Sequence, residues 1–255
     1  MTPHEIQELL GRIAPRGTWC SLRWVETHSE NLTVRDEMLL PPSSTSDRGA
    51  MITVVTGEGQ GIAATSDLSV GGLYQAARVA LDWAQAVSDR GVVDFSKAPR
   101  PMKSGNWNHP VTHSWDEASS ADLVDRLKSI CQSMGGDERI VQRVVSLARS
   151  KTETTLVTTD GVTIQQSHDR LIPWMQALAS DGSDVQSKSN GGRSDAQLGG
   201  LEILDQIGFD QMGSSLREDA IETLLAPVCP NGVMDAVIGP AQMVLQVHES
   251  QIFIF

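Results

Sequence analysis

The chain has 255 residues, of which 40% are hydrophobic and 20% are charged, a composition typical of globular proteins that bury a sizeable core. Its 32 acidic residues outnumber its 20 basic ones and give a formal net charge of −12, which argues against a nucleic-acid partner because phosphate backbones bind clustered Lys and Arg. Three widely spaced cysteines argue against a disulfide framework and favour a reducing compartment. We find no signal peptide and no apolar run long enough to cross a bilayer, and therefore expect a cytoplasmic protein without a membrane partner.

The amino-terminal part of the chain predicts a helix followed by strands. Thr2 and Glu5 have the spacing of a capping box, and Pro3 would occupy the first helical position. The apolar residues that follow recur at helical spacing as far as Pro15. Apolar residues that alternate with polar ones then predict a strand at about 20–24. A second strand is expected at about 31–40, a loop at 41–46, and a hairpin made of 48–56 and 62–66.

Gly57, Gly59 and Gly61 lie between the two strands of this hairpin. Glycines at this spacing also occur in loops that bind phosphate, but a Lys-Ser or Lys-Thr pair and a helix would then follow. Neither follows here. We therefore interpret the segment as a hairpin turn.

The middle of the chain predicts a helix, a long connection and a second set of strands. Asp67 or Ser69 would cap a helix that continues to about Val87. Residues 88–115 contain prolines and little periodicity, which predicts a surface linker that Trp107 and Trp115 attach to the domain. The elements expected next are a helix at 119–134, strands at 140–149, 153–159 and 162–179, a turn at Asp160-Gly161, an irregular stretch at 181–200, and a helix from a capping box at Ser215 to about Leu225.

This order of elements predicts an α+β fold, with a mixed, mainly antiparallel sheet and helices packed on one face. Pro227 and Pro230 indicate a boundary. We therefore assign residues 1–226 to an amino-terminal domain and residues 227–255 to the start of a second domain. In this second part, residues 233–238 predict a buried strand, and Pro240 begins a helix.

His248 and Glu249 lie near the end of this last helix. A strand leading into a helix that carries His-Glu is how many zinc peptidases present a metal ligand beside a general base. Such a site needs a second His about one turn further on, and no His follows Glu249. The residues by themselves predict half of a metal site, with an ordinary surface pair as the alternative.

Three stretches of the chain resemble the amino-terminal portion of the TldD/PmbA family, whose members are also described as proposed modulators of DNA gyrase. They are the hairpin and Ala-rich helix at 48–81, the Asp-Gly hairpin with its long strand at 153–182, and the segment at 233–250, which resembles the family's Gly-Pro helix at the start of an HExxxH motif. The resemblance is closer to the metal-bearing, TldD-type branch.

The resemblance implies a zinc metallopeptidase that acts on small or unfolded peptides, in a dimer with a PmbA-type partner or with itself. His248 would be a zinc ligand and Glu249 the catalytic base. The second His of the motif would fall on Phe253, and a further Cys ligand belongs to a carboxy-terminal domain that this chain lacks. We therefore expect a chain that is truncated within the motif, inactive and without bound zinc. The resemblance assigns no substrate-binding residues.

Other candidate residues have simpler interpretations. The loop at 190–193, Asn-Gly-Gly-Arg, could offer N–H groups and a cation to a peptide carboxylate, but a flexible loop is preferred. Cys229 is interpreted as a buried structural thiol rather than a nucleophile. We expect His109 and His113 to be solvated, and His168, Asp169 and Arg170 not to converge, because adjacent strand residues face opposite sides.

An alternative function is a non-catalytic dimerisation or interaction subunit of a TldD/PmbA-like complex. The apolar tail at 251–255, Gln-Ile-Phe-Ile-Phe, would favour such association. Direct DNA binding, which the description as gyrase modulators suggests, is opposed by the net charge of −12.

Overall fold

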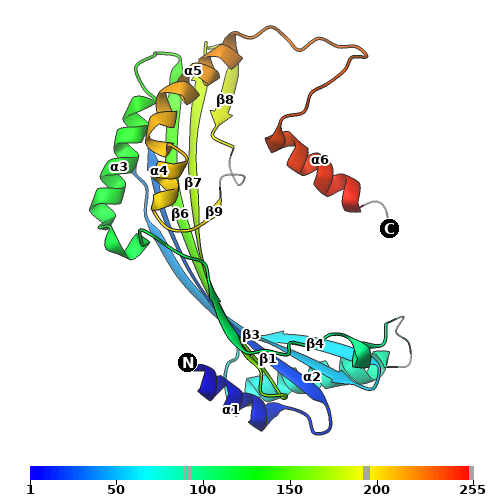
Figure 1. Ribbon diagram of the computed structural model, residues 1–255. Coiled ribbons are helices and arrows are strands. Elements are labelled where there is room, and N and C mark those ends of the chain that lie inside the picture. Colours follow the sequence, from blue (N-terminus) through cyan, green and yellow to red (C-terminus); the bar gives the residue numbers. More distant parts are fainter. Residues whose placement is uncertain (89, 91–92, 192–195, 253–255) are drawn as a thin grey trace. The chain divides into compact units, whose positions relative to one another are not determined.

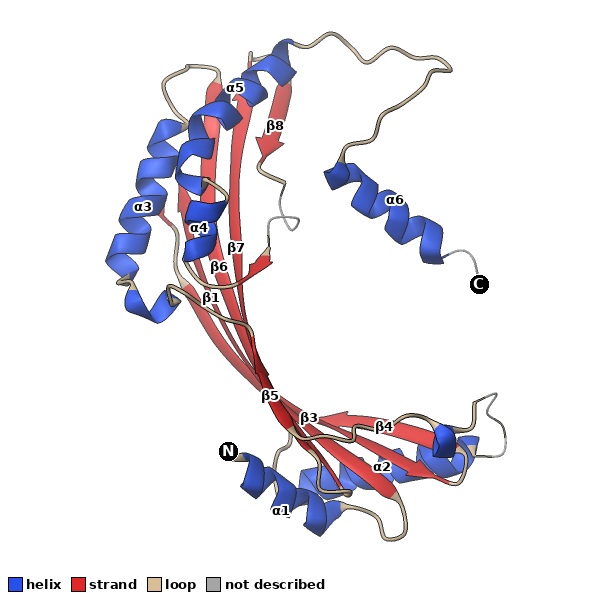
Figure 2. Cartoon of the chain, viewed as in Figure 1, coloured by secondary structure: helices blue, strands red, loops and turns tan. Residues whose placement is uncertain are grey.

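The computed structural model describes residues 1–88, 90, 93–191 and 196–252 and shows the expected α+β fold (Figures 1 and 2). The helices are α1 (Pro3–Ile13), α2 (Val70–Val87), α3 (Ser120–Ser133), α4 (Glu202–Gln206), α5 (Met212–Leu225) and α6 (Pro240–Ile252). The strands are β1 (Trp19–Arg35), β2 (Met38–Leu39), β3 (Ser43–Thr56), β4 (Gly59–Thr65), β5 (Gly105–Asn108), β6 (Ile140–Thr158), β7 (Thr163–Ser180), β8 (Val185–Ser189) and β9 (Gln197–Leu198).

These strands form one hydrogen-bonded sheet in the part of the chain that is described. Its order is β4-β3-β1-β6-β7-β5, while β2 pairs with β1, and β8 and β9 pair with β7. The β3–β4 and β7–β8 pairs are antiparallel, whereas β5 runs parallel to β7. The predicted mixed, mainly antiparallel sheet is therefore confirmed.

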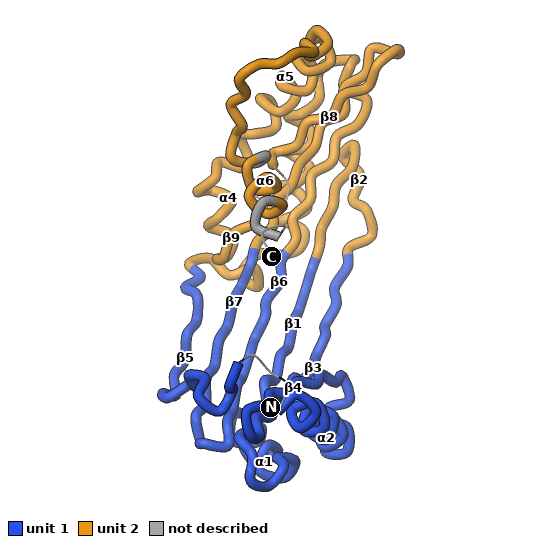
Figure 3. Tube along the Cα trace, turned by 90° about the vertical axis from the view of Figure 1, so that its right-hand side faces the viewer, with its two compact units in different colours: residues 1–30, 43–111, 149–170 blue, residues 31–42, 112–148, 171–255 orange. Residues whose placement is uncertain are grey.

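The chain divides into two compact units, which Figure 3 colours separately. Unit 1 comprises residues 1–30, 43–111 and 149–170. Unit 2 comprises residues 31–42, 112–148 and 171–255. The predicted domain border between residues 226 and 227 is a different division of the chain and stays a prediction.

Unit 1 packs α1 and α2 against the sheet. The predicted capping box is present, because Thr2 N donates to the Glu5 carboxylate and Glu5 N donates to the Thr2 hydroxyl. Ser69 caps α2 by accepting a hydrogen bond from Gly72 N. The core is made of apolar side chains from both helices and from β1 and β3, among them Ile6, Leu10, Leu22, Ile52 and Leu73.

The glycines of the β3–β4 hairpin allow α2 to approach the sheet closely. Thr56 pairs with Gly59, so the turn consists of Gly57 and Glu58, and Gly57 has a positive φ of 55°. A Cβ atom at Gly61 would overlap the carbonyl oxygen of Ala80 on α2. The spacing thus serves a turn and a tight helix–sheet contact, as the hairpin interpretation requires.

Unit 2 has its own core, in which α3, α4 and α5 pack on β6 and β7. Alternate residues of β7 from Leu171 to Ala179 are buried, the pattern of a strand with one face in a core. Trp115 is also buried there, so it attaches the linker to the domain as predicted. Trp107, for which the same was expected, is 52% exposed. Other core residues are Leu127, Ile130, Leu147, Phe209 and Leu216.

Several predicted boundaries are wrong. Residues 20–40 and 140–159 were each expected to contain two strands, but β1 and β6 are continuous until Arg35 and Thr158. The expected loop at 41–46 contains the start of β3, the linker contains β5, and the polar stretch 181–200 contains β8 and β9. The helix expected at Ser215 begins at Met212, and the Ser215 hydroxyl donates to the Met212 carbonyl oxygen instead of capping it.

The expected strand at 233–238 does not form. These residues lie outside any helix or strand and are exposed, so the apolar run has no partner strand to satisfy its backbone groups. The helix that follows does begin at Pro240 as predicted. Among the described residues, no helix combines the length and the apolar character needed to cross a membrane.

Candidate functional site

His248 and Glu249, the residues that the sequence assigns to a metal site, both lie on α6. The first turn of this helix forms with Pro240 at its start and a hydrogen bond from Met243 N to the Gly239 carbonyl oxygen at 3.0 Å. The side chains of His248 and Glu249 are exposed. Consecutive helical residues point about 100° apart, so these two neighbours project in different directions.

The described residues do not fit a catalytic zinc ion. No group of three or more His, Cys, Asp or Glu side chains among them could hold a metal, whereas a catalytic zinc usually takes three protein ligands. Phe253, on which the resemblance would place the second His, lies outside the described residues. His248 and Glu249 by themselves supply at most one imidazole and one carboxylate.

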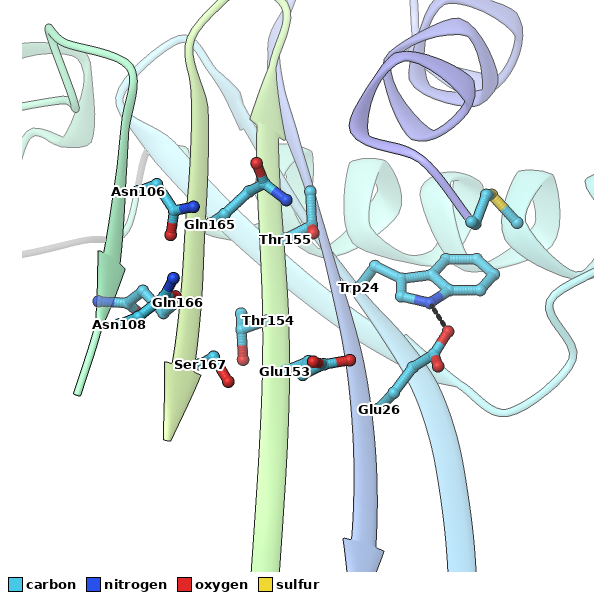
Figure 4. A pocket seen from close by; sticks show the side chains of 11 residues that line it. Trp24, Glu26, Asn106, Asn108, Glu153, Thr154, Thr155, Gln165, Gln166 and Ser167 are labelled. Atoms are coloured by element: carbon cyan, nitrogen blue, oxygen red, sulfur yellow. Dashed lines mark hydrogen bonds between the residues drawn. The ribbon is translucent and has the colours of Figure 1, made fainter. Parts of the chain in front are cut away.

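A polar cavity of about 410 Å³ lies within unit 1 (Figure 4). Four strands contribute to it: Trp24 and Glu26 come from β1, Glu153 and Thr154 from β6, Gln165 and Gln166 from β7, and Asn106 and Asn108 from β5. We call this cavity the amide pocket, after the Asn and Gln residues that line it. No motif predicts it, because its residues come from four separate strands and alternate with residues of other roles.

The two carboxylates of the amide pocket have different partners. The Trp24 indole Nε1 donates to Glu26 Oε1 at 2.9 Å, as Figure 4 shows. Glu153 Oε1 lies 3.3 Å from the ammonium nitrogen of Lys151, which does not line the cavity. The pocket therefore presents negative charge and neutral amides.

A buried ion-pair cluster is the second polar feature of unit 1. Arg149 is only 3% exposed, and its guanidinium Nη2 donates to Asp169 Oδ2 at 2.7 Å. Its Nη1 also lies 3.7 Å from Glu30 Oε2. Buried charges require such pairing, because desolvation would otherwise cost several kcal/mol. We interpret the cluster as structural.

The same ion pair bears on whether His168, Asp169 and Arg170 form a catalytic group. Asp169 pairs with Arg149, Arg170 is exposed, and Nδ1 of His168 is buried without a hydrogen-bond partner in the described structure. The three side chains do not form a catalytic group, as predicted from strand alternation.

Other candidate residues are placed as follows. His109 and His113 are exposed, as predicted. Cys229 was expected to be buried but is exposed, because it follows α5 in a segment, residues 225–240, in which every residue is exposed. Asn190 accepts a hydrogen bond from Met175 N and donates to the Pro173 carbonyl oxygen, which holds the start of its loop on β7. Gly192 and Arg193 of that loop lie outside the described residues.

Comparison with known proteins agrees with these features. Residues 20–84 match the family model of PmbA/TldA metallopeptidase domain 1, and residues 113–226 match that of the PmbA/TldA metallopeptidase central domain. The chain belongs to the PmbA/TldD metallopeptidase family. The resemblance found in the sequence is thereby confirmed at the level of the family.

Individual relatives match only in part. A protein named "Metalloprotease" from Methanothermobacter thermautotrophicus is 30% identical over 113 residues, which are 44% of this chain and 24% of that protein. A protein from Thermotoga maritima, described as a proposed modulator of a DNA gyrase, has the same fold with a TM-score of 0.63 at 20% identity. The match covers 91% of this chain and 50% of that one.

TldE from Thermococcus kodakarensis is a further solved structure with this fold. Its TM-score is 0.54 at 13% identity, and the match covers 88% of this chain and 47% of TldE. The chain thus spans about half the length of these solved relatives. At such identities the likeness concerns the fold alone.

Proposed function

We propose that this chain serves a zinc metallopeptidase of the TldD type that acts on small or unfolded peptides, and that its own contribution is to hold the peptide. The observation that carries the proposal is the pair of PmbA/TldA metallopeptidase domains at 20–84 and 113–226. His248 would be available as one zinc ligand and Glu249 as a general base. Since the described residues offer no set of three ligands, zinc would need ligands from elsewhere.

The sheet supports a role in holding peptides. β5 stands at the end of the strand order and pairs only with β7 among the described strands, so its other edge exposes unpaired backbone groups. An extended peptide can add to such an edge by main-chain hydrogen bonds. The side chains of Asn106 and Asn108 of β5 line the amide pocket beside this edge.

Peptide binding and peptide cleavage, measured separately, test the proposal. Fluorescence anisotropy with short unstructured peptides is expected to show binding, and mass spectrometry of the same samples with added zinc is expected to show intact peptide. Failure to bind any unstructured peptide would contradict the peptide-holding role. Cleavage that zinc restores after chelation, and that is lost in His248→Ala, would contradict the need for further ligands.

A non-catalytic interaction subunit is the second candidate function, and one observation favours it. The segment around α6 exposes apolar side chains, among them Val228, Val233, Val237 and Leu245, and exposed apolar patches commonly mark interfaces. A family partner or a second copy would cover them. Light scattering after size-exclusion chromatography is expected to show a species larger than 27.6 kDa, and a monomer at every concentration would contradict this candidate.

A further inference from the structure

The amide pocket carries net negative charge. Its lining contains the two carboxylates of Glu26 and Glu153 and, among the described residues, no Lys or Arg. Met1, which carries the α-ammonium of the chain, also lines the cavity and offsets one of these two negative charges. Lys151 approaches only Glu153, and the exposed fraction of these two side chains is 39% and 58%. Exposed ion pairs of this kind are weak, so Lys151 leaves much of the charge of the pocket in place.

Glu26 is positioned for a ligand. Its Oε1 accepts a hydrogen bond from the indole of Trp24, and Trp24 is only 5% exposed, so packing fixes the donor. No described residue donates to Oε2 of Glu26, which leaves that oxygen open to a donor in the cavity. An anchored carboxylate with a free oxygen is a receptor for a charged N–H donor.

The remaining lining offers hydrogen bonds of both kinds. The side-chain amides of Asn106, Asn108 and Gln165 lie on one face of the sheet, because Asn106 pairs with Gln165 and strand side chains alternate. They make no hydrogen bond to a described residue, and each carries a donor and an acceptor. Unpaired groups around one cavity match the alternating N–H and C=O groups of a peptide main chain.

We propose that the amide pocket binds a primary ammonium group carried by a peptide, with Glu26 as its principal partner and the amides on the adjoining main chain. The identification of the carrier as a peptide rests on the proposed function, whereas the positive charge follows from the pocket alone. A volume of about 410 Å³ is within the range of small-ligand sites. The ammonium comes either from the amino terminus of the peptide or from a Lys side chain.

Peptides labelled at the carboxyl end distinguish the two sources. The first has a free amino terminus and no Lys, the second is the same peptide with an acetylated amino terminus, and the third is acetylated but contains one Lys. If the amino terminus is the ligand, only the first binds well, and acetylation weakens binding about tenfold, the effect of one charge-assisted hydrogen bond. If a Lys side chain suffices, the third peptide binds as well as the first.

Matched variants test whether the preference for ammonium-bearing peptides arises in the amide pocket. Glu26→Gln keeps the oxygen that accepts from Trp24 but removes the charge, and it is expected to abolish the preference for the ammonium peptides. Glu138→Gln makes the same change of charge at an exposed carboxylate outside the pocket and is expected to leave binding unchanged. Measurement at about 0.15 M salt screens general attraction to the acidic surface. Circular dichroism verifies folding, and Asn106→Ala provides an independent change in the pocket, expected to weaken all the peptides.

Equal binding of the acetylated, Lys-free peptide, or an unchanged preference in Glu26→Gln, would overturn this inference. Cleavage is read from the same samples, so the two proposals can fail separately. Peptide that binds through Glu26 supports the pocket whether or not zinc produces cleavage. Peptides that bind without regard to the ammonium group support the peptide-holding role and refute the pocket.

Discussion

Arg149 and Asp169 form a bidentate ion pair inside unit 1, with the guanidinium Nε 2.9 Å from Oδ1 and Nη2 2.7 Å from Oδ2 of the carboxylate. Asp169→Ala would remove the bidentate partner of the Arg149 guanidinium, which is only 3% exposed. We expect the free energy of unfolding to fall by about 3–5 kcal/mol, as when other buried pairs lose one partner. Urea denaturation followed by circular dichroism measures this loss.

Two further variants test the cause of this loss. Replacing both partners, in Arg149→Met with Asp169→Leu, removes the uncompensated charge and is expected to recover much of the stability. Glu218→Gln breaks the exposed contact with Arg217 and is expected to leave the urea midpoint unchanged. A double variant as unstable as Asp169→Ala would show that lost packing, and not the unpaired charge of Arg149, causes the loss of stability.

A close contact between β4 and α2 gives the second prediction. A methyl group at Gly61 would overlap the backbone of Ala80, so Gly61→Ala must push α2 away from the sheet. We expect a loss of about 1–3 kcal/mol, typical of overpacking in a core. Thermal or urea denaturation measures it.

Gly11→Ala is the matched control. Gly11 lies within α1, and a Cβ atom there would meet no heavy atom within 4 Å. The substitution should therefore stabilise the protein by about 0.5–1 kcal/mol through helix propensity. If both variants were destabilised alike, the close contact with α2 would not be the reason for glycine at position 61.

The sequence predicted those elements whose signals are local. The capping box at Thr2, the Ser69 cap and the Asp160-Gly161 turn form as expected, and Gly161 has a φ of 81°. In each case the deciding atoms belong to residues a few positions apart, so short segments contain the information.

Features that depend on neighbours far along the chain were missed. β1 and β6 continue through polar residues because hydroxyl groups pair across the strands, as between Thr27 and Thr152 at 3.3 Å. The middle of each strand therefore lacks the alternation of apolar and polar residues by which a strand is predicted from sequence. Residues 233–238 are apolar but form no strand, because a strand needs a partner that the sequence pattern does not show. The sequence did not predict the amide pocket either, because its residues on β1 and β5 are far apart along the chain and come together only in the folded protein.

Glu202 gives a prediction on pH. Burial tends to raise the pKa of its carboxyl, but hydrogen bonds from the backbone N–H groups of Gly200, His113 and Thr112 outweigh burial and lower the pKa from 4.5 to about 2. A folded-state pKa below the unfolded one means that the ionised carboxylate stabilises the fold above about pH 4.5, and that this contribution is lost as the pH falls toward 2.

We therefore expect Glu202→Gln to lower the urea midpoint at neutral pH, with a difference from the unmodified protein that narrows as the pH falls from 4.5 toward 2. The anchored residues are Thr112 and His113, which precede α3. Glu138→Gln, at an exposed carboxylate without a hydrogen bond to a described residue, serves as the control. A difference that stays constant across this pH range would show that shape rather than charge at position 202 matters.

The three cysteines should differ sharply in their reaction with thiol reagents. Burial raises the pKa of the Cys20 thiol to about 12 and also raises that of Cys131, and the thiolate is the reactive form. Cys229 is exposed, whereas the other two are buried and all three are free. A thiol reagent should label Cys229 rapidly in the native protein and the other two only on unfolding, as mass spectrometry of digested samples would show. In Cys229→Ser the fast phase should disappear. Rapid native labelling of Cys20 would mean that α1 opens readily from β1, because Cys20 belongs to the same core as Ile6 and Leu10.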